Sequence, residues 1–216
     1  MRNPLLVSSL FALSMFATAQ QFTPRPGLTI PNTKTPWALD QYQGKPQLVP
    51  VHRSLLSLNS HVGANLAGSL AGSFFYKPKT TSELNGLHAR TQIHSSTPVF
   101  YLLVDDEELT ASDKEKDASY TWAICRPIPD KNKRIFATVR TTQLTARAKR
   151  DDYIVDTEVV RLDNGWYRLT PTQALPPGEY AITAVPKGQQ LLPLAVFDFG
   201  IDANAPPAPD AVVDSN

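Results

Sequence analysis

Residues 153–170 read YIVDTEVVRLDNGWYRLT and carry the clearest structural signal in the chain. The first part, 153–162, is rich in β-branched residues, which favour strands. Asn164 and Gly165 accept the positive φ angles of a tight turn, and residues 166–170 then return as a partner strand. The stretch therefore predicts an antiparallel β-hairpin.

Strand patterns recur on both sides of this hairpin, at 99–104, 120–124, 134–140, 179–185 and 194–201. Residues alternate along 134–140, with one predicted face made of Ile135, Ala137 and Val139 and an outward face made of Arg134, Thr138 and Arg140. About eight short strands, spaced by roughly 10 to 15 residues, are typical of all-β domains. We predict an antiparallel β-sandwich or partial barrel over residues 51–201.

Residues 55–75 give conflicting signals. Four aliphatic residues recur near helical spacing: Leu55, Leu58, Val62 and Leu66. Three glycines each disfavour a helix by about 1 kcal/mol relative to Ala, at Gly63, Gly68 and Gly72. We therefore predict a strand or an irregular start, followed by a strand over 73–76. Residues 141–149 are compatible with a short helix between strands.

The two ends of the predicted domain differ from it in composition. Residues 20–50 contain six prolines and predict an extended arm. The arm either lies along the domain surface through its apolar side chains or is a disordered linker. The Pro/Ala/Asp-rich residues 202–216 have little to bury, which predicts a flexible tail.

The N-terminus has the order of a secretory signal peptide, which we assign to residues 1–19. A positive charge at Arg2 precedes a mostly apolar stretch, 5–17, and an A-x-A site that ends at Ala19. The apolar stretch is shorter than the roughly 20 residues that span a bilayer, so no transmembrane helix is predicted. Gln20 stands where a lipoprotein would have Cys, which argues against a lipid anchor.

Composition excludes some classes of protein. Without residues 1–19 the chain keeps 20 of its 21 basic residues beside 20 acidic ones, so its formal charge is zero. A nucleic-acid-binding protein usually has a basic surface, and none is predicted here. The single cysteine, Cys125, rules out an internal disulfide, and its apolar neighbours predict that it is buried.

Charge is nevertheless segregated along the chain. Residues 105–117 are strongly acidic, and residues 126–150 are strongly basic. The acidic run lacks the spacing of a calcium loop and is predicted to be a solvated loop. The basic segment is either an exposed strand face or a docking surface for an anionic partner, such as an acidic envelope protein or an anionic surface polymer.

No catalytic, cofactor-binding or metal-binding residue is predicted. The histidines His52, His61, His88 and His94 lack metal-ligand spacing. Ser69, in AGSLAG, lacks the first glycine of a nucleophile elbow, and the glycines around it lack the lysine of a phosphate loop. Asp156 and Glu158 share a predicted strand face, which exposure on that face explains as well as glycoside hydrolysis does.

Three C-terminal segments read YRLTP at 167–171, LPPGEYAI at 175–182 and FDFGID at 197–202, and two earlier ones read WALDQYQGKPQLVPV at 37–51 and LNGLHA at 84–89. Together these segments resemble a group of exported bacterial proteins of unassigned function, of the kind common in acidobacteria. The resemblance implies export and a β fold but no chemistry. The P-P-G-x-Y step at 176–180 is also loosely similar to a turn in Ig-like and prealbumin-like sandwich modules.

These patterns favour an exported, non-catalytic β-sandwich that binds an envelope protein, a polymer or a small apolar ligand. Two alternatives remain open at this stage. One is an envelope hydrolase of an unrecognised type, and the other is a structural component of an envelope assembly. The export signal does not distinguish the periplasm from release outside the cell.

The signal-peptide assignment predicts where the exported form of the chain begins. Mass spectrometry of the protein recovered from outside the cytoplasm should find an N-terminal peptide that starts at Gln20. An Ala19→Gln variant should stay uncleaved, because the site requires small residues. An exported chain that still carries residues 1–19 would contradict the assignment.

Overall fold

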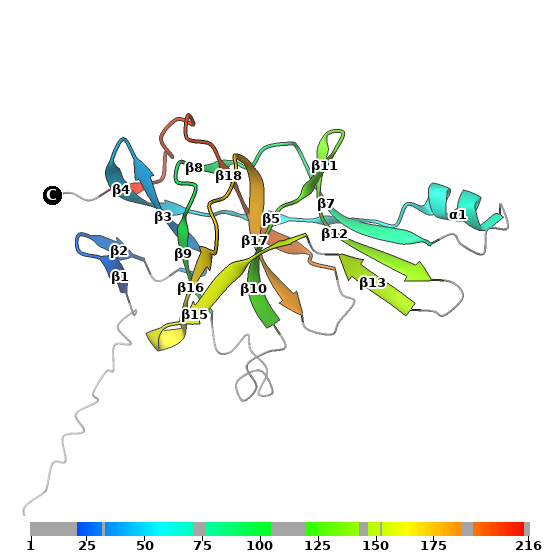
Figure 1. Ribbon diagram of the computed structural model, residues 1–216, viewed down its shortest axis with the longest axis horizontal. Helices are drawn as coiled ribbons and strands as arrows, with labels where there is room; N and C mark the ends of the chain where they lie inside the picture. The colour runs from blue at the N-terminus through cyan, green and yellow to red at the C-terminus, as the bar shows by residue number, and fades with distance from the viewer. Residues whose placement is uncertain are drawn as a thin grey trace, which may run out of the picture.

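The computed structural model describes residues 21–31, 33–70, 77–104, 120–142, 147–151, 153–186 and 192–213. Residues 1–19 and the acidic run 105–117 lie outside this part of the chain. The described residues form three sheets and a separate hairpin (Figure 1). Within them, no helix is long and apolar enough to cross a bilayer.

In the first sheet the strands follow the order β15 (Thr157–Arg161), β16 (Trp166–Pro171), β9 (Val99–Leu103), β3 (Trp37–Tyr42), β4 (Lys45–Pro50) and β19 (Val212–Val213). In the central sheet the strands follow the order β14 (Ile154–Val155), β10 (Tyr120–Cys125), β17 (Gly178–Pro186), β18 (Ala195–Ile201) and β5 (Arg53–Leu55). A further strand, β8 (Thr91–Ile93), pairs with β18. In the distal sheet the strands follow the order β11 (Ile128–Asp130), β12 (Lys133–Thr142), β7 (Lys79–Asn85) and β6 (Ser57–Asn59), and β13 (Arg147–Asp151) pairs with β12. The hairpin is β1 (Phe22–Arg25) with β2 (Leu28–Ile30), and the helices are α1 (Val62–Leu70) and the short 3-10 turn η1 (Asp163–Gly165).

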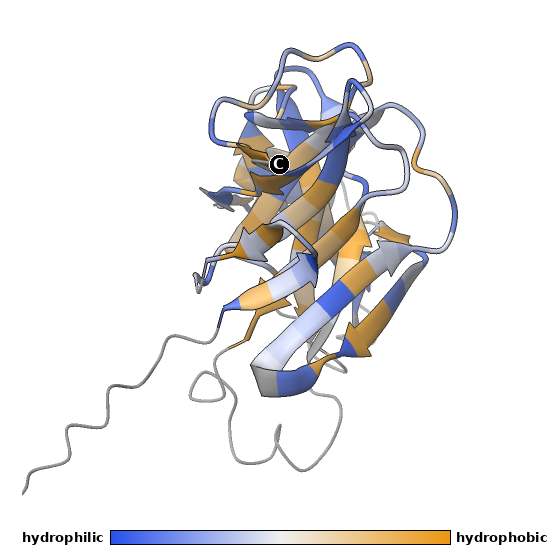
Figure 2. Ribbon diagram, turned by 90° about the vertical axis from the view of Figure 1, so that its left-hand side faces the viewer, coloured by the Kyte–Doolittle hydropathy of each residue, from blue (hydrophilic) through white to orange (hydrophobic). Residues whose placement is uncertain are grey.

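These sheets confirm the predicted all-β, mainly antiparallel fold. Only the pairing of β8 with β18 is parallel among the described strands. Apolar and polar residues alternate along many strands, as Figure 2 shows, so each strand has one face suited to a core. The described strands outnumber the eight expected, because several are only two or three residues long.

The central sheet packs on both of its faces. On one face Tyr180, Ile182 and Phe199 join Phe100 and Leu169 of the first sheet in the main core. The opposite face carries Cys125, Ala181 and Val196, which pack against Leu56 and against Phe136 of the distal sheet. Buried Cys125 confirms the expectation from its apolar neighbours. The sheets therefore stack in the order first, central, distal (Figure 1).

The predicted hairpin over 153–170 is present with one change. Strands β15 and β16 pair from Thr157 with Pro171 to Arg161 with Tyr167, and Gly165 has the positive φ that their turn requires, at 79°. The start of the predicted strand instead becomes β14, which pairs with β10 of the central sheet. One continuous β-branched run therefore supplies strands to two sheets.

The proline-rich range 20–50 is corrected from an extended arm to four strands. Strand β3 pairs with both β4 and β9, so it lies inside the first sheet. The β1–β2 hairpin covers the other face of that sheet, where Phe22 packs on Trp166 with ring centroids 5.3 Å apart. The prolines did not prevent sheet formation because Pro46 and Pro50 lie near the ends of β4, positions at which strands tolerate proline.

The range 202–216, expected to be a flexible tail, is ordered through residue 213. Ala205 is buried, and strand β19 pairs with β4. The His52 ring also lies 2.7 Å from the Asp210 carboxylate. The segment packs against the main core through small alanine side chains, which a search for large apolar residues overlooks.

The ambiguous range 55–75 begins with β5 and β6 and continues as helix α1, which corrects the expectation of strand or irregular structure over 62–70. Local propensity fails here because side-chain hydrogen bonds hold the helix in place. The Asn65 side chain donates to the backbone oxygens of Ser60 and Lys79. The predicted strand over 73–76 lies outside the described residues.

The short helix expected over 141–149 is replaced at its ends by β12 and β13, and residues 143–146 are not described.

A bulge in β12 corrects the predicted faces of 134–140. The register between β12 and β7 shifts between Ile135 and Ala137, so Phe136 and Ala137 are both buried. An extra residue of this kind reverses the alternation on one side of the bulge. Arg134 therefore points inward, with only 3 % of its side chain exposed, instead of outward as expected.

The inward guanidinium of Arg134 joins the distal sheet to the central sheet. Its Nη2 donates to Asp198 over 2.9 Å, and its Nη1 donates to Glu179 over 3.2 Å. Its Nε donates to the backbone oxygen of Gly86. Ser54 and the backbone amide of Ala89 donate to the same two carboxylates. Every polar group of the cluster named here is thus hydrogen-bonded, as a buried charge requires.

Removal of this guanidinium should loosen the junction between the two sheets. We expect Arg134→Met to lower the free energy of unfolding by about 3–5 kcal/mol, because it leaves two carboxylates without their cation in a buried site. Urea unfolding followed by tryptophan fluorescence measures the change. Arg140→Met, on the same strand but exposed, should cost under about 0.5 kcal/mol. Equal losses in the two variants would contradict this role for Arg134.

Candidate functional site

All four histidines lie beside a carboxylate, although no two share one. The pairs are His52 with Asp210 at 2.7 Å, His61 with Glu83 at 3.6 Å, His88 with Glu179 at 3.2 Å and His94 with Asp40 at 2.7 Å. In the described part of the chain, no three His, Cys, Asp or Glu side chains gather in a way that could hold a metal ion. The histidines therefore act at four separate places.

The Asp40–His94 pair is buried and fully hydrogen-bonded. Asp40 accepts from the His94 ring, the Gln47 side chain and the backbone amides of His94 and Ser95. The other ring nitrogen of His94 lies 3.1 Å from the backbone oxygen of Ala205. Both ring nitrogens of His94 therefore lie within hydrogen-bond distance of an oxygen, one of Asp40 and one of Ala205. This pair fastens the C-terminal segment to the first sheet.

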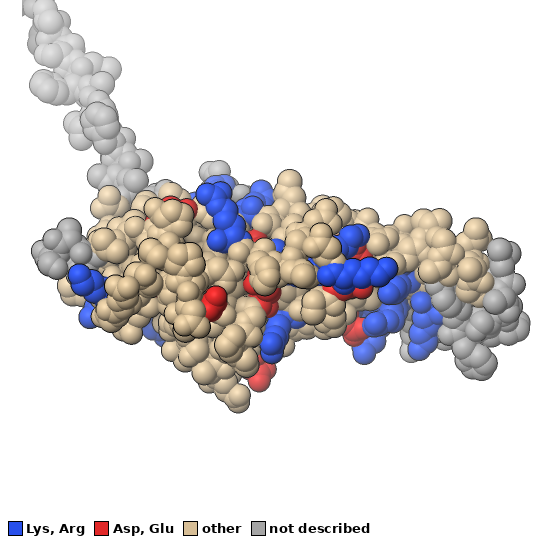
Figure 3. All heavy atoms as spheres, turned by 90° about the horizontal axis from the view of Figure 1, so that it is seen from above, with Lys and Arg blue, Asp and Glu red and all other residues tan. Residues whose placement is uncertain are grey.

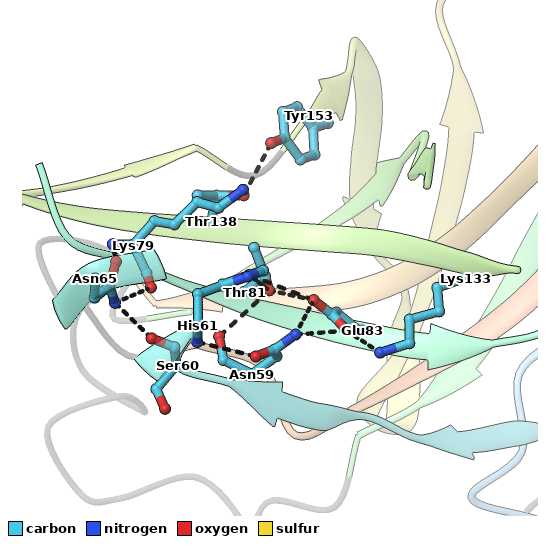
Figure 4. A network of polar contacts seen from close by, with 10 residues as sticks. All are labelled: Asn59, Ser60, His61, Asn65, Lys79, Thr81, Glu83, Lys133, Thr138 and Tyr153. Atoms are coloured by element: carbon cyan, nitrogen blue, oxygen red, sulfur yellow. Dashed lines mark hydrogen bonds and ion pairs between the residues drawn. The ribbon is translucent and has the colours of Figure 1, made fainter. Parts of the chain in front are cut away.

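The densest polar network lies on the outer face of the distal sheet and is drawn in Figure 4. The Glu83 carboxylate accepts from Thr81, from Asn59 over 3.1 Å and from Lys133 over 2.8 Å. The Nε2 atom of His61 lies 2.8 Å from the Thr81 hydroxyl. The cross-strand pairing of β6, β7 and β12 brings these side chains together. Sequence reasoning identified only His61, because the other members lack a motif.

The network changes the acidity of Glu83. Burial raises the pKa of this carboxyl, but the hydrogen bonds from Lys133, Thr81 and Asn59 outweigh burial and leave the pKa below its usual range. The same contact, with the attraction between the two charges, raises the pKa of Lys133. Glu83 is therefore held in its charged form, with its lone pairs already occupied.

The line of His61, Thr81 and Glu83 superficially suggests a hydroxyl nucleophile beside a base. In a catalytic triad the acid orients the base and leaves the nucleophile exposed. Here the Thr81 hydroxyl donates to the acid itself, and Thr81 is only 1 % exposed. A substrate carbonyl has no route to this oxygen. The network thus positions strands and the start of α1, and it has no geometry for nucleophilic attack.

The other residues considered from sequence do not all converge on one site. Asp156 and Glu158 are both exposed beside the first sheet. Ser69 falls within α1, and its side chain is outside the described part. From the basic segment 126–150, Arg126 lies over the Tyr180 ring, with 5.6 Å between guanidinium carbon and ring centroid. Arg126 and Asp156 line the same small hollow, of about 220 Å³, and Glu158 is not among the residues that line it.

A groove of about 710 Å³ lies between the first and central sheets. Its walls carry large apolar side chains from both sheets, including Leu102, Trp122, Ile182 and Phe197. Trp122 and Phe197 are only partly buried, in contrast with Ile182. In the described part of the chain, the core between the two sheets is therefore incomplete at this end.

Two cationic residues also line the groove. Arg53 of β5 lies directly opposite Phe197 of β18, so both side chains are on the face of the central sheet that borders the groove. Lys34 lines the groove from the segment before β3. Among the described lining residues there is no His, Asp, Glu, Ser or Cys. The groove has the composition of a binding site: its described lining contains Lys34, Thr35 and Thr183 but no histidine or carboxylate that could activate them for catalysis.

Comparisons with known proteins add no family: no family model, no curated protein and no solved structure matches this chain.

The charged state of Glu83 predicts a pH-dependent stability. A carboxyl whose pKa is lowered by folding stabilises the protein above the ordinary value of about 4.3, and this contribution is lost as the pH falls through the folded value. We expect Glu83→Gln to cost about 1–3 kcal/mol at pH 7, the range for hydrogen bonds to a charged group. The difference from wild type should shrink toward pH 3, as measured by urea unfolding across the pH range.

The matched control is Glu158→Gln, which removes an exposed carboxylate from β15. This control should change stability by less than about 0.5 kcal/mol at any pH. A Glu83→Gln effect that stays constant from pH 7 to pH 3 would show that lost packing, and not the charge, is responsible.

Proposed function

We propose that this chain is an exported, non-catalytic β-sandwich protein that binds a small amphipathic ligand in the groove between its first and central sheets. The groove is the observation that carries the proposal. Its volume, about 710 Å³, lies in the range of about 300–1,000 Å³ that is typical of small-molecule sites. Export rests on the signal-peptide pattern of residues 1–19.

The lining supports a ligand with an apolar body. Trp122 and Phe197 are large side chains that remain partly exposed at the groove. Covering partly exposed apolar surface is favourable by about 25 cal/mol per Å². A hydrocarbon chain or ring system between the two sheets would complete this end of the core.

The charged residues of the groove lining favour a ligand that carries a negative charge. Arg53 and Lys34 are the only charged residues among the described groove lining. A guanidinium offers paired donors that suit a carboxylate, sulfonate or phosphate. A ligand with an apolar body and one anionic end therefore fits the site best.

The absence of histidine and carboxylate groups from the described lining favours binding over hydrolysis as the role of this groove. The histidine–carboxylate pairs lie elsewhere and use their polar atoms in bonds within the fold. A hydrolase that used the groove would need at least one nucleophile or general base on its wall. The described lining has Lys34 and the Thr35 and Thr183 side chains, but no histidine or carboxylate that could activate a hydroxyl.

Dodecanoate is a suitable probe, and dodecanol is its neutral counterpart. We expect dodecanoate to bind saturably, with a change in Trp122 fluorescence, and dodecanol to bind more weakly because it lacks the charge. Ala184→Leu, which places bulk in the groove lining, should weaken binding of both probes. Arg53→Gln should weaken binding of dodecanoate alone, by about tenfold for the loss of one charged hydrogen bond.

Arg161→Gln is the matched charge control, since Arg161 is exposed on β15 of the first sheet and does not line the groove. It should leave both affinities unchanged. Isothermal titration calorimetry supplies the affinities and the stoichiometry. The proposal fails if neither probe binds saturably, or if Ala184→Leu binds both as wild type does.

A further inference from the structure

Helix α1 lies in an uncharged stretch of the sequence and forms one end of the described part of the molecule. Residues 54–76 contain no Asp, Glu, Lys or Arg. Within this range helix α1 projects beyond the distal sheet (Figure 1). Val62 is 69 % exposed and Leu66 is 58 % exposed, and residues four apart lie on the same side of a helix. The helix thus presents two large aliphatic side chains to solvent.

This exposure is imposed by the way the helix is attached. The Asn65 amide donates to the backbone oxygen of Lys79 over 3.1 Å and accepts from the backbone amide of Lys79 over 3.2 Å. It also donates to the backbone oxygen of Ser60. These bonds fix α1 to the start of β7. The helix is therefore held in place by polar contacts while Val62 and Leu66 remain uncovered.

A row of cations crosses the distal sheet next to the helix. Arg140 of β12 lies directly opposite Lys79 of β7 and also directly opposite Lys149 of β13. The three side chains consequently share one face, although like charges placed opposite each other destabilise a sheet. Among the described residues, Asp151 is the one carboxylate paired with the row, and it contacts Arg140 and Lys149. The Lys149 side chain is 82 % exposed.

The helix and the cation row adjoin, because Asn65 bonds to the backbone of Lys79 itself. Figure 3 shows Lys and Arg side chains gathered beside the uncharged end of the molecule. An exposed apolar patch next to clustered basic residues is the combination that binds the interface of an anionic membrane. Phosphate groups would face the cations, and the aliphatic side chains would enter the boundary of the acyl chains.

From this juxtaposition we propose that the α1 end of the distal sheet docks onto the surface of an anionic phospholipid bilayer. Val62 and Leu66 insert at the headgroup boundary, and Lys79, Arg140 and Lys149 contact lipid phosphates. A second copy of this chain suits the surface less well, because a symmetric contact would bring the same cations together. An acidic protein would satisfy the cations but gives no reason for the exposed aliphatic pair. The proposal is independent of the ligand groove.

Vesicle co-sedimentation tests the docking. The chain should begin at Gln20, so that the apolar residues 5–17 do not bind lipid themselves. We expect binding to vesicles that contain phosphatidylglycerol to be at least about tenfold tighter than binding to pure phosphatidylcholine. Binding should weaken as salt is raised, because salt screens charges at the surface. Equal binding to both kinds of vesicle, or no binding to either, would overturn the proposal.

Two double variants at the α1 end of the distal sheet separate the apolar contribution to membrane binding from the charged one. Val62→Ala with Leu66→Ala keeps a strong helix former at each position, and Lys79→Gln with Lys149→Gln removes two cations. Each pair should weaken binding to the anionic vesicles by about fivefold or more. Lys149→Gln alone, at an exposed position, should give a smaller loss in the same direction and does not depend on folding of the double variant.

The matched control is Lys45→Gln with Arg161→Gln, which removes the same charge from exposed positions on the first sheet. This control should bind as the wild type does. An equal loss in the control would overturn the proposal in favour of non-specific attraction. If the cation variant loses binding but the alanine variant does not, the surface is an electrostatic site for a polyanion, and the lipid proposal is wrong.

Discussion

The Arg134 guanidinium is the contact on which the arrangement of the three sheets depends. The distal sheet shares only a small apolar core with the central sheet, whereas the first and central sheets share a much larger one. At this weaker junction a buried cation is bonded to carboxylates from two central strands. Such a cluster requires all of its partners at defined positions. It therefore fixes the angle at which the distal sheet, with α1 at its end, projects from the rest of the molecule.

The two proposed surfaces follow from incomplete packing at separate places. Between the first and central sheets, Trp122 and Phe197 are partly uncovered at the groove. At the far end of the distal sheet, Val62 and Leu66 of α1 are exposed. Cations border both surfaces, at Arg53 and along the row that begins at Lys79. The same requirement, apolar contact beside a negative charge, applies to the partner of each surface.

Much of the fold could be predicted from sequence because it rests on local signals. The β15–β16 hairpin follows from β-branched residues and a turn that requires Gly165, and the strand at 99–103 follows from a short apolar run. Predictions failed where distant contacts outweigh local preference. Side-chain bonds of Asn65 hold α1 despite its glycines, and the bulge in β12 turns Arg134 inward. The candidate sites could not be predicted, because the groove and the Glu83 network join residues that only the strand pairing brings together.

Strands from early in the chain pair with strands from its end, and this affects how the protein folds. Strand β5 pairs with β18, and β4 pairs with β19, so both large sheets need residues beyond 195. Contacts between distant parts of a chain form slowly, because a long loop must close before they are made. During synthesis the main core therefore stays open until nearly the whole chain exists. The delay suits the export proposed above, because a chain whose main core has not yet closed can cross a membrane unfolded.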